Sequence, residues 1–574
     1  MSVATVDPRK TFPRRFVPTD ANMGDWAHIE PLFRELLDRK IDSSAALQRW
    51  LEDLSELQSA VAEEGSRRYV AMTQQTDDPQ REQAYLHFVR EIRPRLEPMV
   101  FALKKKYLAT PHRHGLPQDR YFVFDRDTAN DVELFREENI PLHVREAELQ
   151  QQYQKITGGM TVHYRGEERT LQQMARFLEE PDRSVRQEAW ERIVGRRLQE
   201  REAIEAIYEQ LLSLRQQIAR NAGFTNYLDY GFRAKGRWDY TPEDCERFHA
   251  AVAEHVVPVV QRLYEERRAR LGLDALRPWD LDVDPLGRSP LRPFEHAGEL
   301  VEKCERVFAR VTPALGEQFR FMVERDLLDL DSRKGKAPGG YQATMHERRW
   351  PFIFMNAVGR DGDVRTIVHE GGHAFHALAA REEPLLKYRH APLEFAEVAS
   401  MGMEVLALPH LEVFYPDPDD ARRARRDFFE GVVRLMPWIA IVDAFQHWIY
   451  THPEHTRDER RAKWLELSRR FRPGIDWSGY EEAEAHAWHA QLHIFLHPLY
   501  YIEYGIAQLG ALQLWLASRD DYAGAVRRYR AALALGGSRP LPDLFAAAGL
   551  RFAMDAGVVA PLAAALGEEL RELS

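Results

Sequence analysis

One short run near the middle of the chain, TIVHEGGHAFH from Thr366 to His376, constrains the fold more than any other segment. It contains the pattern His-Glu-x-x-His, in which His369 and His373 are four residues apart. Residues at this spacing share one face of an α-helix, so a helical run lets both imidazoles hold a single Zn²⁺. Glu370 then points roughly 100° away from His369 and can reach a water at the metal without occupying a coordination position. A pattern this short also occurs by chance, so the rest of the chain must supply the other parts of a site.

Two glycines, Gly371 and Gly372, lie inside this predicted helix. A glycine in a helix interior costs about 1 kcal/mol relative to alanine. The cost indicates that the missing side chains make room for a close neighbour, which is either a crossing helix or the backbone of a substrate.

The next segment offers a third metal ligand, which a catalytic zinc ion requires besides its open position. LEFAEVASMGMEVLAL, from Leu393 to Leu408, is apolar on nearly every side and is expected to form a buried helix. A buried carboxylate needs a cation, and spacing alone leaves Glu394 and Glu397 as equal candidates, with an arginine partner as the alternative to a metal. Glu404 shares a face with Glu397 and is expected to accept a hydrogen bond from a ligand histidine.

The segment before the motif has the composition of strands. Between Gly335 and Asn356, glycines, aromatic and β-branched residues surround a polar turn. We predict a short antiparallel sheet whose second strand runs from Pro351 to Asn356, with Asp363 as the N-cap of the metal-binding helix. If this strand is at an edge, a peptide can pair with it through main-chain hydrogen bonds, although most such hairpins are only structural. The expected substrate-binding residues are Phe354 and Asn356 on the strand and Gly339, Gly340 and Tyr341 in the loop before it.

A histidine- and tyrosine-rich segment, HAWHAQLHIFLHPLYYIEY, lies near the C-terminus from His486 to Tyr504. Its polar side chains recur at spacings of four and three, which predicts one helical face that Pro498 kinks or divides. Such a face suits hydrogen-bond donors aimed at a carbonyl oxygen that gains negative charge, and polar packing in the core is the alternative. The members of this predicted face are His489, His493, His497, Tyr501 and Tyr504.

The remaining chain is mostly helical by its hydrophobic periodicity. Helical patterns run from about residue 29 to 109, from 144 to about 156, and from about 171 to 222, where Asn221-Ala222-Gly223 is a stop signal. Residues 160–171 are predicted to form a β-hairpin that turns near Gly166-Glu167, and the proline-rich stretch 278–293 an irregular connection. A chain of 574 residues is too long for one hydrophobic core, so several subdomains are expected.

Composition excludes several classes of protein. The net charge of −11 argues against a nucleic-acid partner, and the absence of a long apolar run argues against a membrane span. The N-terminal residues lack the apolar core of a secretory signal. Cys245 and Cys304 are the only cysteines, which favours a reducing cytoplasm over a disulfide framework. Neither is in a Cys-x-x-Cys pattern or beside a histidine pair, which argues against thiolate chemistry.

These motifs, taken together and in order, resemble the M3 family of zinc metallopeptidases, specifically its thimet oligopeptidase-like oligoendopeptidase F branch. The similarity is carried by KAPGGY (336–341), PFIFMN (351–356), DVRTIVHEGGHAFH (363–376), FAEVAS (395–400) and HIFLHPLYYIEY (493–504), and it extends to EEGSRRY (63–69), NAGFTNY (221–227) and PLPDLF (540–545). The resemblance favours Glu397 over Glu394 as the third ligand. It assigns the tyrosines near the scissile bond to Tyr500 or Tyr501, followed by Tyr504. The family usually has a larger residue at the position of Gly371.

The resemblance implies a mostly α fold with two lobes, a deep central channel, and a small antiparallel sheet beside the metal. We expect an N-terminal helical lobe with a small β-hairpin over residues 1–195 and a catalytic helical domain over residues 196–574. The narrow channel would admit short unfolded peptides. The chain would act as a monomer or homodimer without nucleic acid or membrane.

The sequence therefore predicts a cytoplasmic zinc oligoendopeptidase that cleaves internal bonds of short peptides by a metal-activated water. One Zn²⁺ per chain would be held by His369, His373 and Glu397, with Glu370 as general base and then acid. His493, together with one of the three tyrosines 500, 501 and 504, would stabilise the oxyanion, and His497 would contact the substrate. The alternatives are a helical zinc carboxypeptidase and a catalytically silent peptide-binding homologue.

Overall fold

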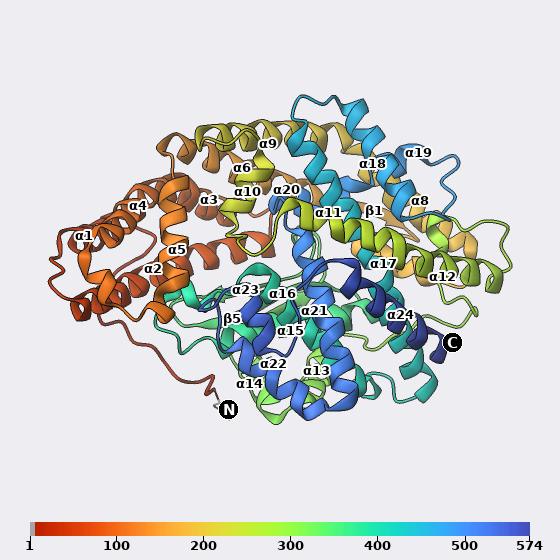
Figure 1. Ribbon diagram of the computed structural model, residues 1–574. Helices are drawn as coiled ribbons and strands as arrows, with labels where there is room; N and C mark the ends of the chain where they lie inside the picture. The colour runs from red at the N-terminus through yellow and green to blue at the C-terminus, as the bar shows by residue number, and fades with distance from the viewer. Residues whose placement is uncertain (1–5) are drawn as a thin grey trace.

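The computed structural model describes residues 6–574. These residues form a mostly helical fold with one two-stranded and one three-stranded sheet, as Figure 1 shows. The first half contains α1 (Trp26–Asp38), α2 (Ser44–Gln74), α3 (Pro79–His87), α4 (Arg93–Ala109), α5 (Gln118–Leu134), α6 (Ile140–Gly158), β1 (Thr161–Tyr164), β2 (Glu167–Thr170), α7 (Leu171–Ala175), α8 (Arg183–Gln199), α9 (Arg201–Asn221), α10 (Tyr227–Ala234), α11 (Pro242–Ala251) and α12 (Val257–Arg270). The second half contains α13 (Ala297–Val311), α14 (Pro313–Glu324), β3 (Leu328–Asp331), β4 (Tyr341–Met345), β5 (Trp350–Ala357), α15 (Asp361–Ala379), α16 (Leu393–Ala407), α17 (Pro418–Thr451), α18 (Arg457–Phe471), α19 (Glu481–Ala485), α20 (Leu492–Leu496), α21 (Tyr501–Asp520), α22 (Tyr522–Leu533), α23 (Leu541–Ala547) and α24 (Ala556–Glu572).

The N-terminal helices α1, α2, α4 and α5 share a hydrophobic core of their own and form the left end of the molecule in Figure 1. Phe33 of α1 and Trp50 of α2 are fully or almost fully buried in this core. Tyr388, from the connection between α15 and α16, closes it and donates a hydrogen bond to the carbonyl of Arg120 in α5. The N-terminal helices are therefore fastened to the segment that follows the His-Glu-x-x-His helix.

The small sheet beside the motif differs in topology from the prediction. Strands β4 and β5 form the predicted antiparallel pair, with Tyr341 opposite Phe354 and Met345 opposite Trp350. A third strand that the sequence did not reveal, β3, pairs in parallel with β5, so that the order is β3-β5-β4. The expectation that the strand from Pro351 to Asn356 aligns a peptide is therefore wrong, because β5 already has a hydrogen-bonded neighbour on each side. Strand β4 is the edge next to the motif.

The β-hairpin prediction near residue 165 is correct, and the long helix after it is divided. Strands β1 and β2 pair with Thr161 opposite Thr170, and Arg165 and Gly166 form the turn with φ of 51° and 84°. The helical pattern from 171 to 222 is three helices, because Asp182 begins a new helix as an N-cap and the chain bends again near Glu200. Helix α9 ends at Asn221 as predicted, with Gly223 at a φ of 91°.

Helices α15 and α16 cross closely enough to explain one glycine of the motif. A Cβ on Gly372 would lie 2.4 Å from the carbonyl oxygen of Ala399 and 2.5 Å from Cα of Ser400. The crossing helix that the glycine pair predicted is thus α16, the helix that carries the candidate glutamates. Gly371 instead faces the ring of Phe308, which a Cβ would approach to 2.6 Å.

The N-cap prediction needs a small correction. Helix α15 begins at Asp361 with Arg360 as its N-cap, and Asp363 is the third helical residue. Its carboxylate still caps the helix, because Asp363 Oδ2 accepts hydrogen bonds from the backbone N–H groups of Val358 at 2.7 Å and Arg360 at 2.9 Å. The cap therefore fixes the turn between β5 and α15.

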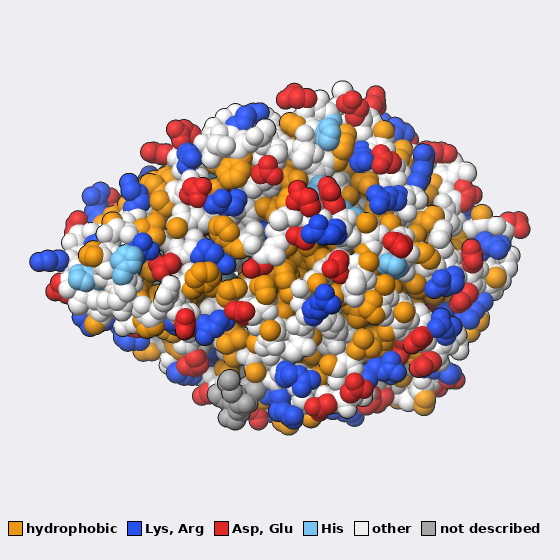
Figure 2. All heavy atoms as spheres, in the orientation of Figure 1, with side chains coloured by type: hydrophobic (Ala, Val, Ile, Leu, Met, Phe, Trp, Pro, Cys, Tyr) orange, Lys and Arg blue, Asp and Glu red, His pale blue; other side chains and the backbone are white. Residues whose placement is uncertain are grey.

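The surface is mixed in charge. On the face shown in Figure 2, acidic and basic side chains alternate with apolar ones, and neither sign forms a continuous patch. None of the helices among residues 6–574 is both long enough and apolar enough to cross a bilayer.

Candidate metal centre and active site

Three side chains from α15 and α16 converge as a set of metal ligands. Glu397 Oε2 lies 3.3 Å from His369 Nε2 and 3.4 Å from His373 Nε2. Two atoms that bind one zinc ion at about 2.0–2.1 Å in tetrahedral geometry lie roughly 3.3 Å apart. Imidazole nitrogen and carboxylate oxygen are also donor types that zinc accepts, so the residues present fit the metal.

Hydrogen bonds fix the carboxylate of Glu397, which is 1% exposed. The hydroxyl of Ser400, one turn further along α16, donates to Glu397 Oε2 at 2.8 Å. The hydroxyl of Tyr500 donates to Glu397 Oε1. Both oxygens are therefore oriented before any metal binds.

Behind the candidate ligands, Glu404 contacts His369 and Arg365. Its Oε1 is 2.8 Å from His369 Nδ1, and its Oε2 accepts a hydrogen bond from Arg365 Nε at 2.8 Å. Because Nδ1–H donates to the carboxylate, Nε2 of His369 keeps the lone pair that a metal requires.

The other candidate ligand, Glu394, has different partners. Tyr240 donates a hydrogen bond to Glu394 Oε1, and Arg237 Nε lies 3.9 Å from the same oxygen. The arginine-pair alternative considered for these glutamates therefore describes Glu394, and Glu397 alone of the two joins the histidines.

Glu370 lies beside the ligands and has no partner for one oxygen. The residue is 5% exposed, and its Oε2 is buried without a hydrogen-bond partner. Burial raises the pKa of Glu370 above its ordinary value, which suits a group that first accepts a proton and later returns it.

These groups line one cavity of about 550 Å³. One wall is the edge strand β4, through Gln342, Ala343 and Thr344. Tyr69 of α2 and Gln154 of α6 also line the cavity. The loop residues Gly339 and Gly340 and the first residue of β4, Tyr341, also line it. The cavity thus combines a free strand edge with the candidate metal ligands.

Close packing explains why the loop beside Glu370 needs glycine. A Cβ on Gly340 would lie 3.1 Å from Thr366 Cγ2 and 3.4 Å from Glu370 Oε1. Tyr341 stacks on Phe354 with ring centroids 4.6 Å apart, and its hydroxyl shares a hydrogen bond with the hydroxyl of Thr73 at 2.6 Å. Its ring is therefore held between the sheet and helix α2.

The predicted continuous His/Tyr face is broken in the structure. Helix α20 ends at Leu496, α21 begins at Tyr501, and Leu499 between them has a φ of 60°. The break follows from Pro498, which cannot continue the hydrogen bonding of α20. His489 belongs to a separate 3-10 turn before α20, and its side chain lies 3.1 Å from Glu205 in the core and does not line the cavity.

The other histidines and tyrosines of this segment divide between cavity and core. His493, His497, Tyr500 and Tyr504 line the cavity. Tyr501 does not, and its hydroxyl donates to Gln491 Oε1 at 3.1 Å. The structure therefore brings Tyr500 to the candidate metal ligand Glu397 and Tyr504 to His493.

A hydrogen-bond chain sets the tautomer of His493, which burial holds neutral by lowering its pKa to about 3. The indole N–H of Trp438 donates to Gln491 Oε1 at 3.0 Å, so the amide nitrogen of Gln491 faces His493 Nδ1 at 2.8 Å. Nδ1 then accepts, and Nε2–H donates to Tyr504 across 3.0 Å. Tyr504 keeps its own O–H for a group in the cavity.

Two expected substrate-binding residues lie behind the cavity wall. Phe354 is fully buried beneath Tyr341. Asn356 donates from Nδ2 to the carbonyls of Ala337 and Gly339, both at 2.9 Å, and so shapes the loop. Neither residue lines the cavity.

The sequence analysis missed the residues that position these groups. Gln491 lies within the His/Tyr-rich segment but not on its predicted face, and Trp438 lies 53 positions away outside every motif, so no local pattern connects them. Gln342 and Thr344 of β4 could have been found by asking which strand of the predicted hairpin is the edge.

Comparison with known proteins agrees with the resemblance found in the motifs. The family model described as Peptidase family M3 matches residues 176–563, and that of the Peptidase M3 N-terminal domain matches residues 16–135. The chain is 25% identical over 239 residues to the group B oligopeptidase PepB of Streptococcus agalactiae serotype III (strain NEM316), which is 40% of this chain and 37% of that protein. It is 28% identical over 154 residues to an oligoendopeptidase F homolog of Lactococcus lactis subsp. lactis (strain IL1403), which covers 27% and 25% of the two chains. The matches thus span well under two thirds of these curated relatives.

A solved structure covers much more of the chain. The structure of PZ peptidase A with an inhibitor superimposes with a TM-score of 0.92 and 28% sequence identity. The superposition includes 97% of this chain and 99% of that one. The predicted mostly helical fold and the family resemblance are both confirmed by these comparisons.

Proposed function

The chain belongs to peptidase family M3, and on this premise we propose that it is a zinc-dependent endopeptidase that cleaves internal bonds of short unfolded peptides. The observation that carries the proposal is the position of Glu397 Oε2, 3.3 and 3.4 Å from the Nε2 atoms of His369 and His373, beside the unpartnered carboxylate of Glu370. The names of the relatives, an oligopeptidase and an oligoendopeptidase F homolog, support the substrate class.

The cavity supports short, extended substrates. Its volume of about 550 Å³ accommodates a few residues and excludes a folded protein. Strand β4 pairs on one side only within the described sheet, so an extended peptide can add to its free edge through main-chain hydrogen bonds. Gln342 and Thr344 on this edge are then the residues that we propose to contact the peptide backbone.

The metal would be held by His369, His373 and Glu397. When bound, zinc supplies a Lewis acid that polarises the peptide carbonyl and makes water acidic enough to ionise near neutral pH. Imidazole and carboxylate ligands also accept other divalent ions, so zinc rests on the ligand set and on the family.

The protein groups then move protons and stabilise charge. Glu370 takes a proton from the attacking water and delivers it to the leaving amine. Tyr504, whose O–H is left free by the hydrogen bond from His493, donates to the carbonyl oxygen as it gains negative charge. Tyr500 holds Glu397 in its ligand position.

Replacing Glu370 by glutamine tests the proposal. The substitution keeps the volume and removes the proton acceptor, so hydrolysis of a peptide blocked at both ends should fall by about 10²–10⁴-fold while the zinc content stays the same. Internal cleavage by the unmodified enzyme excludes the carboxypeptidase alternative, which needs a free C-terminus. Unchanged hydrolysis in Glu370→Gln would refute the assigned base, and no hydrolysis by either form would favour the silent peptide-binding homologue.

Two further expectations remain proposals. We propose that the N-terminal lobe, residues 1–195, covers the cavity, because Tyr69 and Gln154 line it. We also propose a reducing cytoplasm as the location, because Cys245 and Cys304 are both buried and unbridged.

A further inference from the structure

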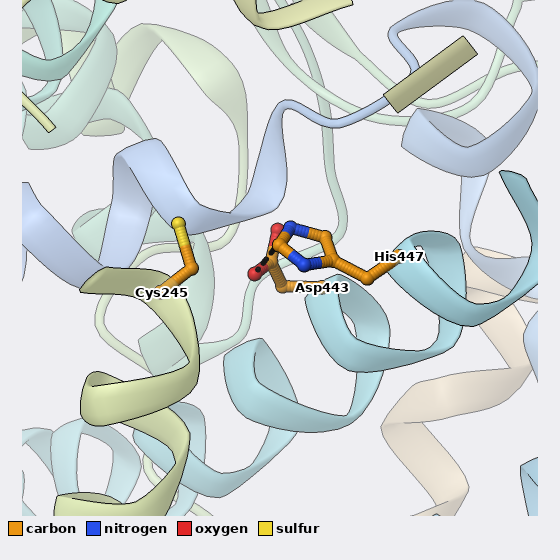
Figure 3. A group of neighbouring side chains, drawn as sticks. All are labelled: Cys245, Asp443 and His447. Atoms are coloured by element: carbon orange, nitrogen blue, oxygen red, sulfur yellow. Dashed lines mark ion pairs between the residues drawn. The ribbon is translucent and has the colours of Figure 1, made fainter. Parts of the chain in front are cut away.

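A second group of possible metal ligands is buried between α11 and α17 (Figure 3). Cys245 of α11 and Asp443 and His447 of α17 each offer one ligand atom, and these atoms all lie within 4.8 Å of one another. Cys245 and Asp443 are fully buried, and His447 is 8% exposed. The group shares no residue with the metal centre described above.

One distance within this group equals a distance between the candidate catalytic ligands. His447 Nε2 lies 3.3 Å from Asp443 Oδ2, the same separation as between His369 Nε2 and Glu397 Oε2. Asp443 and His447 are four residues apart and share one face of α17, as the two histidines of the motif do on α15. In Figure 3, Cys245 approaches them from the neighbouring helix.

Two polar atoms of the group have no partner. His447 Nε2 and Asp443 Oδ1 are buried without a hydrogen bond. A buried polar atom without a partner is costly and uncommon, so it calls for an explanation such as an ion. Both atoms belong to side chains that offer a metal-ligand atom within 4.8 Å of the other ligand atoms of this group.

The direct ion-pair partners of Asp443 are imidazoles. Among residues 6–574, its ion-pair contacts are to His249 at 2.9 Å and His447 at 3.3 Å. The guanidinium of the nearby Arg237 donates to Glu503 at 2.8 Å and makes no ion-pair contact with Asp443. Asp443 therefore has two histidines, and neither an arginine nor a lysine, as its direct partners.

We propose that Cys245, Asp443 and His447 form a second metal site, which binds a thiolate-accepting divalent cation such as Zn²⁺ and cross-links α11 to α17. On binding, the Cys245 S–H bond breaks, its proton passes to solvent, and the sulfur forms a bond to the metal. One thiolate and one carboxylate then balance the two positive charges. His249 Nε2–H donates to Asp443 Oδ2 at 2.9 Å and orients the ligand carboxylate.

This site revises the interpretation of the cysteines. In the sequence, neither cysteine is beside a histidine pair, because Cys245 and His447 are about 200 positions apart. Only the packing of α11 against α17 brings them together. The inference does not depend on the proposed peptidase activity, since no residue of the catalytic cavity takes part.

Cobalt substitution tests the site in the full-length protein. Cobalt binds both zinc-type sites, but only a thiolate ligand gives a sulfur-to-cobalt charge-transfer band in the near ultraviolet. The catalytic centre has no sulfur ligand, so the band reports on Cys245 alone. The unmodified protein, produced with excess cobalt, should show this band and contain two metal ions per chain.

Matched variants assign the band. Cys245→Ser should abolish it and lower the content to one ion per chain, whereas Cys304→Ser, which alters the other buried cysteine, should change neither. His369→Ala removes a catalytic ligand and should keep the band. One ion per chain and no band in the unmodified protein would overturn the proposal, as would a band that persists in Cys245→Ser. If Cys245→Ser does not fold, the metal content and spectrum of the unmodified protein still decide the question.

Discussion

Two glutamates three residues apart on α16 have different environments. Glu397 faces His369 and His373, whereas Glu394 faces Tyr240 and Arg237. Periodicity alone could not separate them, because both belong to a helix that is buried on nearly every side. The distinction arises from the tertiary fold, which places the connection between α10 and α11 beside Glu394 and helix α15 beside Glu397.

Glutamine substitutions at these two positions should have opposite effects. Glu397→Gln removes an anionic metal ligand and should lower metal affinity and peptide hydrolysis by at least about 10²-fold with little loss of stability. Glu394→Gln should keep the metal but lower the free energy of unfolding by about 1–3 kcal/mol, because Arg237 loses a buried anionic neighbour. Metal analysis and denaturant unfolding of both variants separate these outcomes. Loss of metal in Glu394→Gln would contradict the ligand assignment.

The three tyrosines near the break between α20 and α21 are also distinguishable. Tyr504→Phe removes the proposed oxyanion donor and should lower kcat by about 10²–10³-fold with KM nearly unchanged. Tyr501→Phe should change kcat by less than about tenfold, since its hydroxyl faces Gln491 in the core. Tyr500→Phe should mainly weaken metal binding, by about 10–100-fold, because its hydroxyl holds Glu397. Equal effects of all three substitutions on kcat would contradict these assignments.

At the scale of secondary-structure elements, the sequence predicted the helices and strands that have a local repeating pattern. It did not predict the elements that form only through contacts with residues distant in the chain. The helix of the motif, the buried helix after it and the β4-β5 pair follow from periodicity and turn residues. The parallel strand β3 could not be predicted, since a four-residue strand pairs with β5 only through the tertiary fold. The His/Tyr segment shows a second limit of prediction from sequence. Pro498 predicted that the helix is interrupted, but it did not predict the positive φ of Leu499 that turns Tyr500 toward Glu397.

The crossing of α15 and α16 makes a prediction about glycines in one helix. Gly372→Ala places a Cβ 2.4 Å from the backbone of Ala399, so the helices must separate and Glu397 must leave the histidines. We expect a loss of about 1–3 kcal/mol of stability together with loss of bound metal. Gly362→Ala is the matched control in the same helix, because its Cβ meets nothing within 4 Å, and it should leave stability unchanged or raise it by up to about 1 kcal/mol. Retained metal in Gly372→Ala would show that the crossing does not position Glu397.

At the scale of the whole molecule, the N-terminal helices and the sheet beside the metal meet at Asp329 of β3. Gln74, the last residue of α2, donates its side-chain amide to Asp329 Oδ2 at 2.8 Å. Arg333 binds Asp329 and also donates to the carbonyl of Gln74, and the buried Lys336 donates to Asp329 Oδ1 at 2.8 Å. One carboxylate thus joins an N-terminal helix to the sheet and to the loop that lines the cavity.

This junction should weaken in acid. Burial opposes ionisation of Asp329, but the hydrogen bonds from Arg333 and Lys336 prevail and lower the pKa of its carboxyl to about 2. A carboxylate whose pKa is lower in the folded than in the unfolded state stabilises the fold above the unfolded value of about 3.9 and loses that contribution as pH falls toward 2. The contribution at neutral pH is about 2 kcal/mol by this linkage.

The variant Asp329→Asn tests this contribution, because it lacks the titrating group. The unfolding free energy of the variant, measured by denaturant between pH 5 and 3, should fall less steeply than that of the unmodified protein. Because α2 and the cavity loop share this carboxylate, the loss of stability in acid should be accompanied by faster proteolysis. Cleavage should be faster in the chain between α2 and β4 than within α15. Parallel pH dependences in the two proteins would show that Asp329 does not hold the two parts together.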